Sequence, residues 1–348
     1  MTLEMQPQFT ELSLSRRRWF RFSVRSLPVF TTLVACFLGW IAKERSQAWS
    51  ERQIGKKLQE QGCSLKFLGR FDSLELSDKR KPQGWWRDLA RKVLGERIVS
   101  IYMSRPNVES LSLLTGFSSL QRLHLRPSHL ADLTPLAGLK NLKQLYLGIS
   151  RVTDLTPLAG LGNLKQLHLS ISRVTDLTPL AELENLHKLT LYNGHRLSDL
   201  TPLAGLKNLR LLSLTTRVTD LTPLSGLTNL EGLRVLRYHV TDLTPLAGLK
   251  NLLRLDLRIM RVADVTPLMG LKNLQRLNFS TARVTDQTLT GFKSLEALLG
   301  RSIHASDLTP LAGLTKLKKL SLPITLVSDK QMSELMQTLP GCSVVRQQ

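Results

Sequence analysis

Asp132-Leu-Thr-Pro-Leu-Ala-Gly-Leu139 is the stretch that decides the fold, because it returns whole or nearly whole toward the C-terminal end. Its leading aspartate is repeated at steps of 21 to 23 residues. These aspartates are Asp132, Asp154, Asp176, Asp199, Asp220, Asp242, Asp264, Asp286, Asp307 and Asp329. A fixed period of this length indicates that the chain is built from stacked copies of one structural unit.

Each unit carries the spacing of a strand joined to a short helical turn. In the first complete unit, Leu145 and Leu147 alternate around Tyr146, which is the alternation of side chains along a strand. The leucines are expected to point inward and Tyr146 outward. Thr134 suits an N-cap, and Pro135 suits the first position of the turn. Since one unit cannot close a core alone, the sequence predicts an α/β leucine-rich-repeat solenoid.

Residues 108–329 resemble the leucine-rich repeats of the internalin type and those of the protein phosphatase 1 regulatory subunit, on the strength of the Thr-Pro-Leu phrase. The resemblance implies a horseshoe with a parallel β ribbon on its concave face, where partners bind. Those families place an asparagine three residues after the last strand leucine, where it joins neighbouring coils. Here that slot holds Ser128, Ser150, Ser172, Thr216, Met260 and Ala282. A weaker tie between coils is therefore expected, and the unit at Asp286, which has lost its proline, is interpreted as a local irregularity.

An uncharged stretch near the N-terminus predicts a single transmembrane helix. Residues 26–42 carry no charge, and their length is at the lower limit for a bilayer span. The arginines before it predict a cytoplasmic N-terminus and a repeat domain outside the cytoplasm, in the periplasm or at the cell surface. The predicted segments are a basic cytoplasmic N-terminus (1–25), a transmembrane signal anchor (26–42), a juxtamembrane helix with an N-terminal cap (43–107), the solenoid (108–329) and a C-terminal cap (330–348). This order resembles that of bacterial single-pass membrane leucine-rich-repeat proteins.

Three other interpretations of the uncharged stretch stay open, namely a cleaved signal peptide, a lipoprotein signal and a buried soluble helix. The segment Leu33–Cys36 is similar to a lipobox, but the apolar run continues to Ile41, past the cysteine that would be lipidated. Cys36, Cys63 and Cys342 lie far apart and form no metal-binding motif. No zinc site, disulfide framework or cofactor is therefore expected.

A first row of surface residues is a candidate binding site on the concave face. The outward slot between the last two strand leucines carries a tyrosine or histidine in four successive coils, and neighbouring slots add cations and a further tyrosine. The candidates are Tyr102, His124, Tyr146, His168, Arg122, Arg126, Lys188 and Tyr192. Exposed aromatic residues beside arginine are typical of binding hot spots. The alternative is ordinary filling of strand positions by residues of high β propensity.

A second row, the Arg/His edge, lies just past each strand. Its members are Arg151, Arg173, Arg196, Arg217, His239, Arg261 and Arg283. A line of guanidinium groups suits an extended polyanion, because each binds phosphate, sulfate or carboxylate with two parallel bonds. The alternative is that each arginine pairs with the aspartate three residues later, which would form weak ion pairs at the rim.

The sequence contains no phosphate-binding glycine loop and no motif of a hydrolase or metalloprotease, so we predict that the protein is not an enzyme. The predicted function is a membrane-tethered binding scaffold for a protein or an anionic envelope polymer. The net charge of +21 suggests a second hypothesis, binding of nucleic acid or acidic lipid. The predicted location outside the cytoplasm argues against nucleic acid. A third hypothesis is a structural spacer without a specific ligand.

Overall fold

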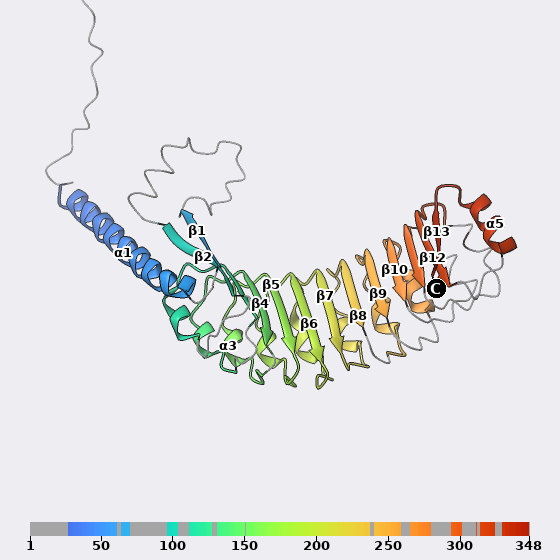
Figure 1. Cartoon of the computed structure of the whole chain (residues 1–348), viewed down its shortest axis with the longest axis horizontal. Coiled ribbons are helices and arrows are strands. Elements are labelled where there is room, and N and C mark those ends of the chain that lie inside the picture. The colour runs from blue at the N-terminus through green and yellow to red at the C-terminus, as the bar shows by residue number, and fades with distance from the viewer. Residues whose placement is uncertain are drawn as a thin grey trace, which may run out of the picture.

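The computed structural model describes residues 27–60, 64–69, 96–103, 111–126, 131–149, 151–236, 240–258, 265–279, 294–300, 311, 314–323 and 329–347. The described strands form one thirteen-stranded sheet in strict chain order. The first pair is antiparallel, and every later neighbouring pair is parallel. Figure 1 shows the strands along the inner side of an arc and the short helices along its outer side. The predicted solenoid with a parallel ribbon is confirmed.

Strands and turns alternate along the arc. The strands are β1 (Ser64–Gly69), β2 (Glu96–Met103), β3 (Arg122–Leu125), β4 (Gln144–Ile149), β5 (Gln166–Ile171), β6 (Lys188–Gly194), β7 (Leu211–Thr216), β8 (Gly232–Leu236), β9 (Arg254–Arg258), β10 (Arg276–Phe279), β11 (Ala297–Gly300), β12 (Lys319–Pro323) and β13 (Ser343–Gln347). The helices are α1 (Leu27–Glu60), α3 (Thr156–Ala159) and α5 (Asp329–Thr338). The 3-10 turns are η3 (Ser112–Gly116), η4 (Thr134–Leu136), η5 (Thr178–Leu180), η6 (Thr201–Gly205), η7 (Thr222–Leu224), η8 (Thr244–Leu246) and η9 (Thr266–Gly270).

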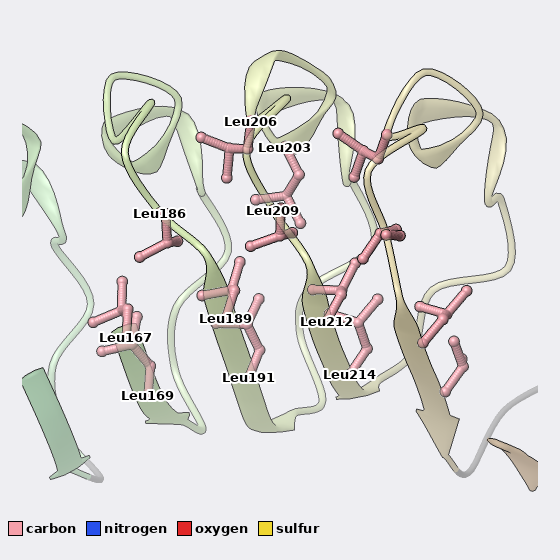
Figure 2. Close-up of a cluster of buried hydrophobic side chains, with 14 of the residues drawn as sticks. Leu167, Leu169, Leu186, Leu189, Leu191, Leu203, Leu206, Leu209, Leu212 and Leu214 are labelled. Carbon is pink, nitrogen blue, oxygen red and sulfur yellow. The ribbon is translucent and has the colours of Figure 1, made fainter. Parts of the chain in front are cut away.

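One continuous leucine core runs through the coils. Leu189 and Leu191 of β6 are fully buried, as is Leu186 in the segment before the strand. Figure 2 shows equivalent leucines of adjacent coils side by side, with Leu212 and Leu214 of β7 repeating the positions of Leu189 and Leu191. Burial of one leucine side chain stabilises the fold by about 1.5–3 kcal/mol. Because much of this contact comes from the next coil, each unit depends on its neighbours.

The repeat turns η4, α3, η5, η6, η7 and η8 are each capped by the leading aspartate of their unit. Asp132 Oδ1 accepts a hydrogen bond from the backbone N–H of Thr134 at 2.8 Å. The same bond is made by Asp154, Asp176, Asp199, Asp220 and Asp242. The prediction that Thr134 is the N-cap is wrong, because Leu133 occupies the cap position and Thr134 is the first residue of η4. A carboxylate two residues upstream does what the threonine side chain was expected to do.

Neighbouring coils are joined by an asparagine ladder in the loops before β4 to β10. Asn163 Nδ2 donates to the backbone carbonyl of Lys140 at 2.9 Å, and Asn185 Nδ2 donates to that of Gly162 at 2.8 Å. Equivalent bonds are made by Asn141, Asn208, Asn229, Asn251 and Asn273. An asparagine elsewhere in the repeat therefore ties the coils together, and the weaker tie expected at the other slot stays a prediction. In the slot where asparagine was expected, the buried Thr216 hydroxyl has no partner among the described residues.

The one 23-residue step, from Asp176 to Asp199, is absorbed by a bulge in β6. The pairing of β6 with β7 shifts register between Leu191 and Gly194. Asn193 lies in this interval with φ of +56°, a left-handed conformation that asparagine tolerates better than most residues. The extra residue is accommodated locally, so the leucines on either side keep their positions in the core.

The C-terminal part of α1 packs against the first coils. Ala48, Glu51 and Leu58 share one helical face and are buried. The Glu51 carboxylate accepts the backbone N–H of Ile98 at 3.0 Å and the hydroxyl of Ser119 at 3.0 Å. This helix therefore covers the end of the leucine core, where a first coil has no preceding neighbour.

The preceding part of α1 is not packed. Residues 31–40 are exposed on every side of the helix. Among the described residues, no helix is both long enough and apolar enough to cross a membrane, and the transmembrane anchor predicted over 26–42 is not confirmed. Residues 286–292, where the irregular unit lacks its proline, lie outside the described residues.

Candidate binding face

Four rings from successive strands stack on the concave face. Tyr102, His124, Tyr146 and His168 occupy one register of β2, β3, β4 and β5. The His124 and Tyr146 rings are nearly parallel, with centroids 4.0 Å apart. Tyr102 lies 5.9 Å from His124, and His168 lies 5.5 Å from Tyr146. We call these four residues the ring stack, and its outer faces line a shallow hollow of about 170 Å³.

Arg126 is fixed on top of the ring stack. Its guanidinium carbon lies 5.1 Å from the Tyr146 ring centroid, and its Nη2 donates to the Tyr146 hydroxyl at 3.0 Å. Gly148 permits this placement, since a Cβ built there would lie 3.2 Å from Arg126 Cγ. Arginine over an aromatic face is favourable, and here it also places a positive charge beside the rings. Arg126 was expected from the sequence and Gly148 was not, although a glycine inside a strand is a signal of close approach by another group.

Both histidines of the ring stack favour the neutral form. Burial lowers the pKa of His124, and the charge of Arg126 lowers it further. Burial also lowers the pKa of His168, with smaller effects from Lys188 and His124. Near neutral pH, the ring stack is therefore a neutral surface flanked by permanent cations, and an anionic ligand would favour protonation of the histidines.

Of the remaining concave candidates, Arg122 and Lys188 lie beside the ring stack and Tyr192 does not. Arg122 Nε donates to Ser100 Oγ at 2.7 Å, which holds the arginine on the neighbouring coil. Lys188 begins β6 and lies close enough to lower the pKa of His168. Tyr192 is exposed but pairs in register with Ser170, farther along the strands, so the structure does not bring it into the ring stack.

The Arg/His edge is only partly described. Arg151, Arg173 and Arg196 are exposed, and none of them forms an ion pair with the rest of the described chain. Pairing with the following aspartate, the alternative from the sequence, is not observed for these three because each aspartate caps its turn instead. Arg217 is also exposed. His239, Arg261 and Arg283 lie outside the described residues.

No protein-family model matches the chain, and no curated protein matches its sequence. Among solved structures, an internalin from Listeria monocytogenes is 28% identical with a TM-score of 0.58, and the match covers 68% of this chain and 70% of that one. The chain has the leucine-rich-repeat fold and resembles this internalin. A leucine-rich-repeat protein of Leptospira interrogans matches the chain at 24% identity and a TM-score of 0.51, covering 67% of this chain and 56% of its own. At that identity the second likeness shows the fold alone.

Proposed function

We propose that this internalin-like protein is a non-catalytic scaffold that binds a partner protein, or an anionic polymer of the cell envelope, along its concave face. The observation that supports this most strongly is the ring stack with Arg126 above it. The leucine core is complete without these side chains, since the strand leucines on the opposite face fill it. Rings of few rotatable bonds lose little conformational entropy when they bind, which is why tyrosine is common in binding sites.

The Arg/His edge supports the anionic alternative within this proposal. Arg151, Arg173 and Arg196 come from successive coils and have no ion-pair partner among the described residues. Adjacent strands are about 4.8 Å apart, so successive arginines are spaced on the same scale. A regularly charged polymer would contact several of them at once, and the affinity would fall steeply with salt.

We also propose that the exposed part of α1 attaches the protein to a lipid bilayer. Leu33, Phe37 and Leu38 are 63%, 58% and 58% exposed on a helix that carries apolar residues on every side. A helix that is apolar all round is stable when an apolar environment covers it. In the sequence, the arginines at 16–18, 21 and 25 precede this segment, which places positive charge where lipid head groups would lie.

The binding proposal is tested by crosslinking the full-length protein in its native membrane and identifying the crosslinked species by mass spectrometry. A Tyr146→Ala/His168→Ala variant should lose the principal crosslinked species, since removal of hot-spot residues weakens binding by about 2 kcal/mol or more. Trp49→Ala is the matched control, because Trp49 is an aromatic residue of α1 that is 65% exposed. Equal crosslinking by the two variants would refute the role of the ring stack.

The bilayer proposal is tested separately by alkaline carbonate extraction of membranes. The full-length protein should stay in the membrane pellet, and a Leu33→Asp/Phe37→Asp/Leu38→Asp variant should move to the supernatant. Replacement of Lys56 and Lys57 by aspartate is the control, since both are exposed on the docked part of the same helix. Extraction of the unmodified protein into the supernatant would end this proposal and leave the ring stack untouched.

A further inference from the structure

A second hollow lies on the concave face, toward the C-terminal side of the ring stack. It has a volume of about 310 Å³ and is lined by residues of β6 to β11. At its centre Leu211 and Gly232 face each other in register on β7 and β8. Leu211 is 37% exposed, although leucines elsewhere in these coils are mostly buried. We call this region the Leu211 hollow.

Gly232 creates the Leu211 hollow. The equivalent register position holds Gln144, Gln166 and Lys188 in the preceding coils and Arg254 in the next, all of which are long side chains. A Cβ on Gly232 would lie only 2.8 Å from a methyl carbon of Leu211. The missing side chain therefore leaves room for the Leu211 side chain, which lies over Gly232 and stays 37% exposed in the hollow. An exposed apolar group in a recess gains free energy when an apolar ligand group covers it.

Cations lie on both sides of this recess. Lys188 precedes Leu211 in the same row, while Arg254 and Arg276 follow Gly232. None of the three takes part in an ion pair with the described residues. Lys188 and Arg254 are three strand spacings apart, or about 14 Å. Their charge is thus available to a ligand that spans the recess.

The adjacent row of the hollow, formed by Ser213, Arg234 and Asp256, carries no free positive charge, because its arginine is paired with its aspartate. Arg234 Nε donates to Asp256 Oδ2 at 2.9 Å, which neutralises the pair. In the same row, the Ser213 hydroxyl is buried and has no hydrogen-bond partner among the described residues. The free positive charge therefore lies in the row of Lys188, Arg254 and Arg276.

We propose that the Leu211 hollow binds an extended acidic segment of a partner protein, with one large apolar side chain seated in the hollow against the exposed side chain of Leu211. In an extended chain, alternate side chains face the same way and consecutive residues rise about 3.3 Å. Side chains two positions before and after the apolar residue are then about 13 Å apart, which matches the Lys188 to Arg254 spacing of about 14 Å. The segment has a carboxylate at both positions, so its pattern is acidic, any, apolar, any, acidic. This site adjoins the ring stack on the same concave face, with Lys188 flanking both, so the inference deepens the partner binding proposed above and rests on it.

Three fluorescein-labelled peptides test the charge and the apolar group independently. The first contains Asp-Ser-Leu-Ser-Asp, the second replaces its leucine by serine, and the third replaces both aspartates by asparagine. Binding to the full-length protein is followed by fluorescence anisotropy at low salt. We expect the first peptide to bind about tenfold more tightly than either of the others, since each comparator loses one of the two contacts.

Protein variants locate the peptide. Leu211→Ser should weaken the first peptide about tenfold and leave the serine peptide unchanged, because only the first has an apolar group to lose. Arg254→Glu/Arg276→Glu should weaken both aspartate peptides about tenfold or more. The control is Lys56→Glu/Lys57→Glu, an equal charge change at exposed residues of α1, at the other end of the solenoid. Circular dichroism checks that each variant is folded.

Equal binding of all three peptides, or an unchanged affinity for Leu211→Ser, would overturn the proposal. Equal losses in the two charge-reversal variants would overturn it too, since they would show attraction to the net positive charge alone. A Tyr146→Ala/His168→Ala protein should keep full affinity for the first peptide. The test therefore gives its answer whether or not the ring stack binds a partner.

Discussion

Removal of the Glu51 carboxylate should detach α1 from the solenoid. Glu51 is fully buried, and its carboxylate accepts the Ile98 N–H and the Ser119 hydroxyl. Hydrogen bonds to a charged group contribute about 1.5–3 kcal/mol each, and a buried amide left unpaired costs about 1–3 kcal/mol. We therefore expect Glu51→Ala to weaken the docking of α1 by about 3 kcal/mol. Because stability in a solenoid is local, the loss should concentrate in α1 and β2.

Hydrogen exchange measured by NMR gives the assay. A loss of about 3 kcal/mol corresponds to exchange on the order of a hundredfold faster at the Ile98 amide. Glu51→Gln should fall in between, because the amide oxygen still accepts a hydrogen bond. Glu60→Ala is the matched control, since Glu60 belongs to the same helix and is exposed. If Glu51→Ala protects Ile98 as well as Glu60→Ala does, the docking contact described above has been assigned wrongly.

Three further perturbations test the repeats. Asn208→Ala removes the hydrogen bond to the Glu184 carbonyl and should lower the free energy of unfolding, measured by urea denaturation, by about 1 kcal/mol. An equal loss on replacing an exposed loop residue by alanine would contradict the asparagine ladder. Leu189→Ala opens the fully buried core and should cost about 2–5 kcal/mol in the same assay; a loss below 1 kcal/mol would show that the site collapses. The side chain and backbone N–H of Thr178 lower the pKa of Asp176, so its contribution is present above the ordinary pKa of 3.8 and is lost as the pH falls toward the lower folded value. Melting temperatures between pH 7 and 3 should thus fall less for Asp176→Asn than for the unmodified protein, and parallel curves would contradict the cap.

The repeat period predicted the sheet because leucine recurs at the same strand and core positions of each unit. Leu145 and Leu147 alternate around Tyr146, and the structure buries the two leucines and leaves the tyrosine on the concave surface. The four rings were expected in one row, since a fixed period brings equivalent residues into register. Their functional role stays a prediction.

Polar contacts between coils were harder to predict, because the sequence shows that a residue repeats without showing what it contacts. Asn163 and Asn185 recur as faithfully as the aspartates, yet only the stacked coils reveal carbonyl acceptors from the preceding unit. The Leu211 hollow was missed for a related reason. It arises where the repeat departs from its own pattern, at Gly232, and a search for regularity passes over such a position.

The strictly sequential sheet gives the molecule a mechanical direction. Among the described strands, β6 is hydrogen-bonded to β5 and β7 alone, so tension applied to the C-terminal end loads one strand pair at a time. The coils would unfold one after another, and each unfolded unit would lengthen the extended chain by roughly 22 residues, or about 70 Å. When the force is applied at the C-terminal end, the first coils, which α1 covers, would unfold last. A ligand bound across several coils would hold neighbouring coils together and so resist this unfolding.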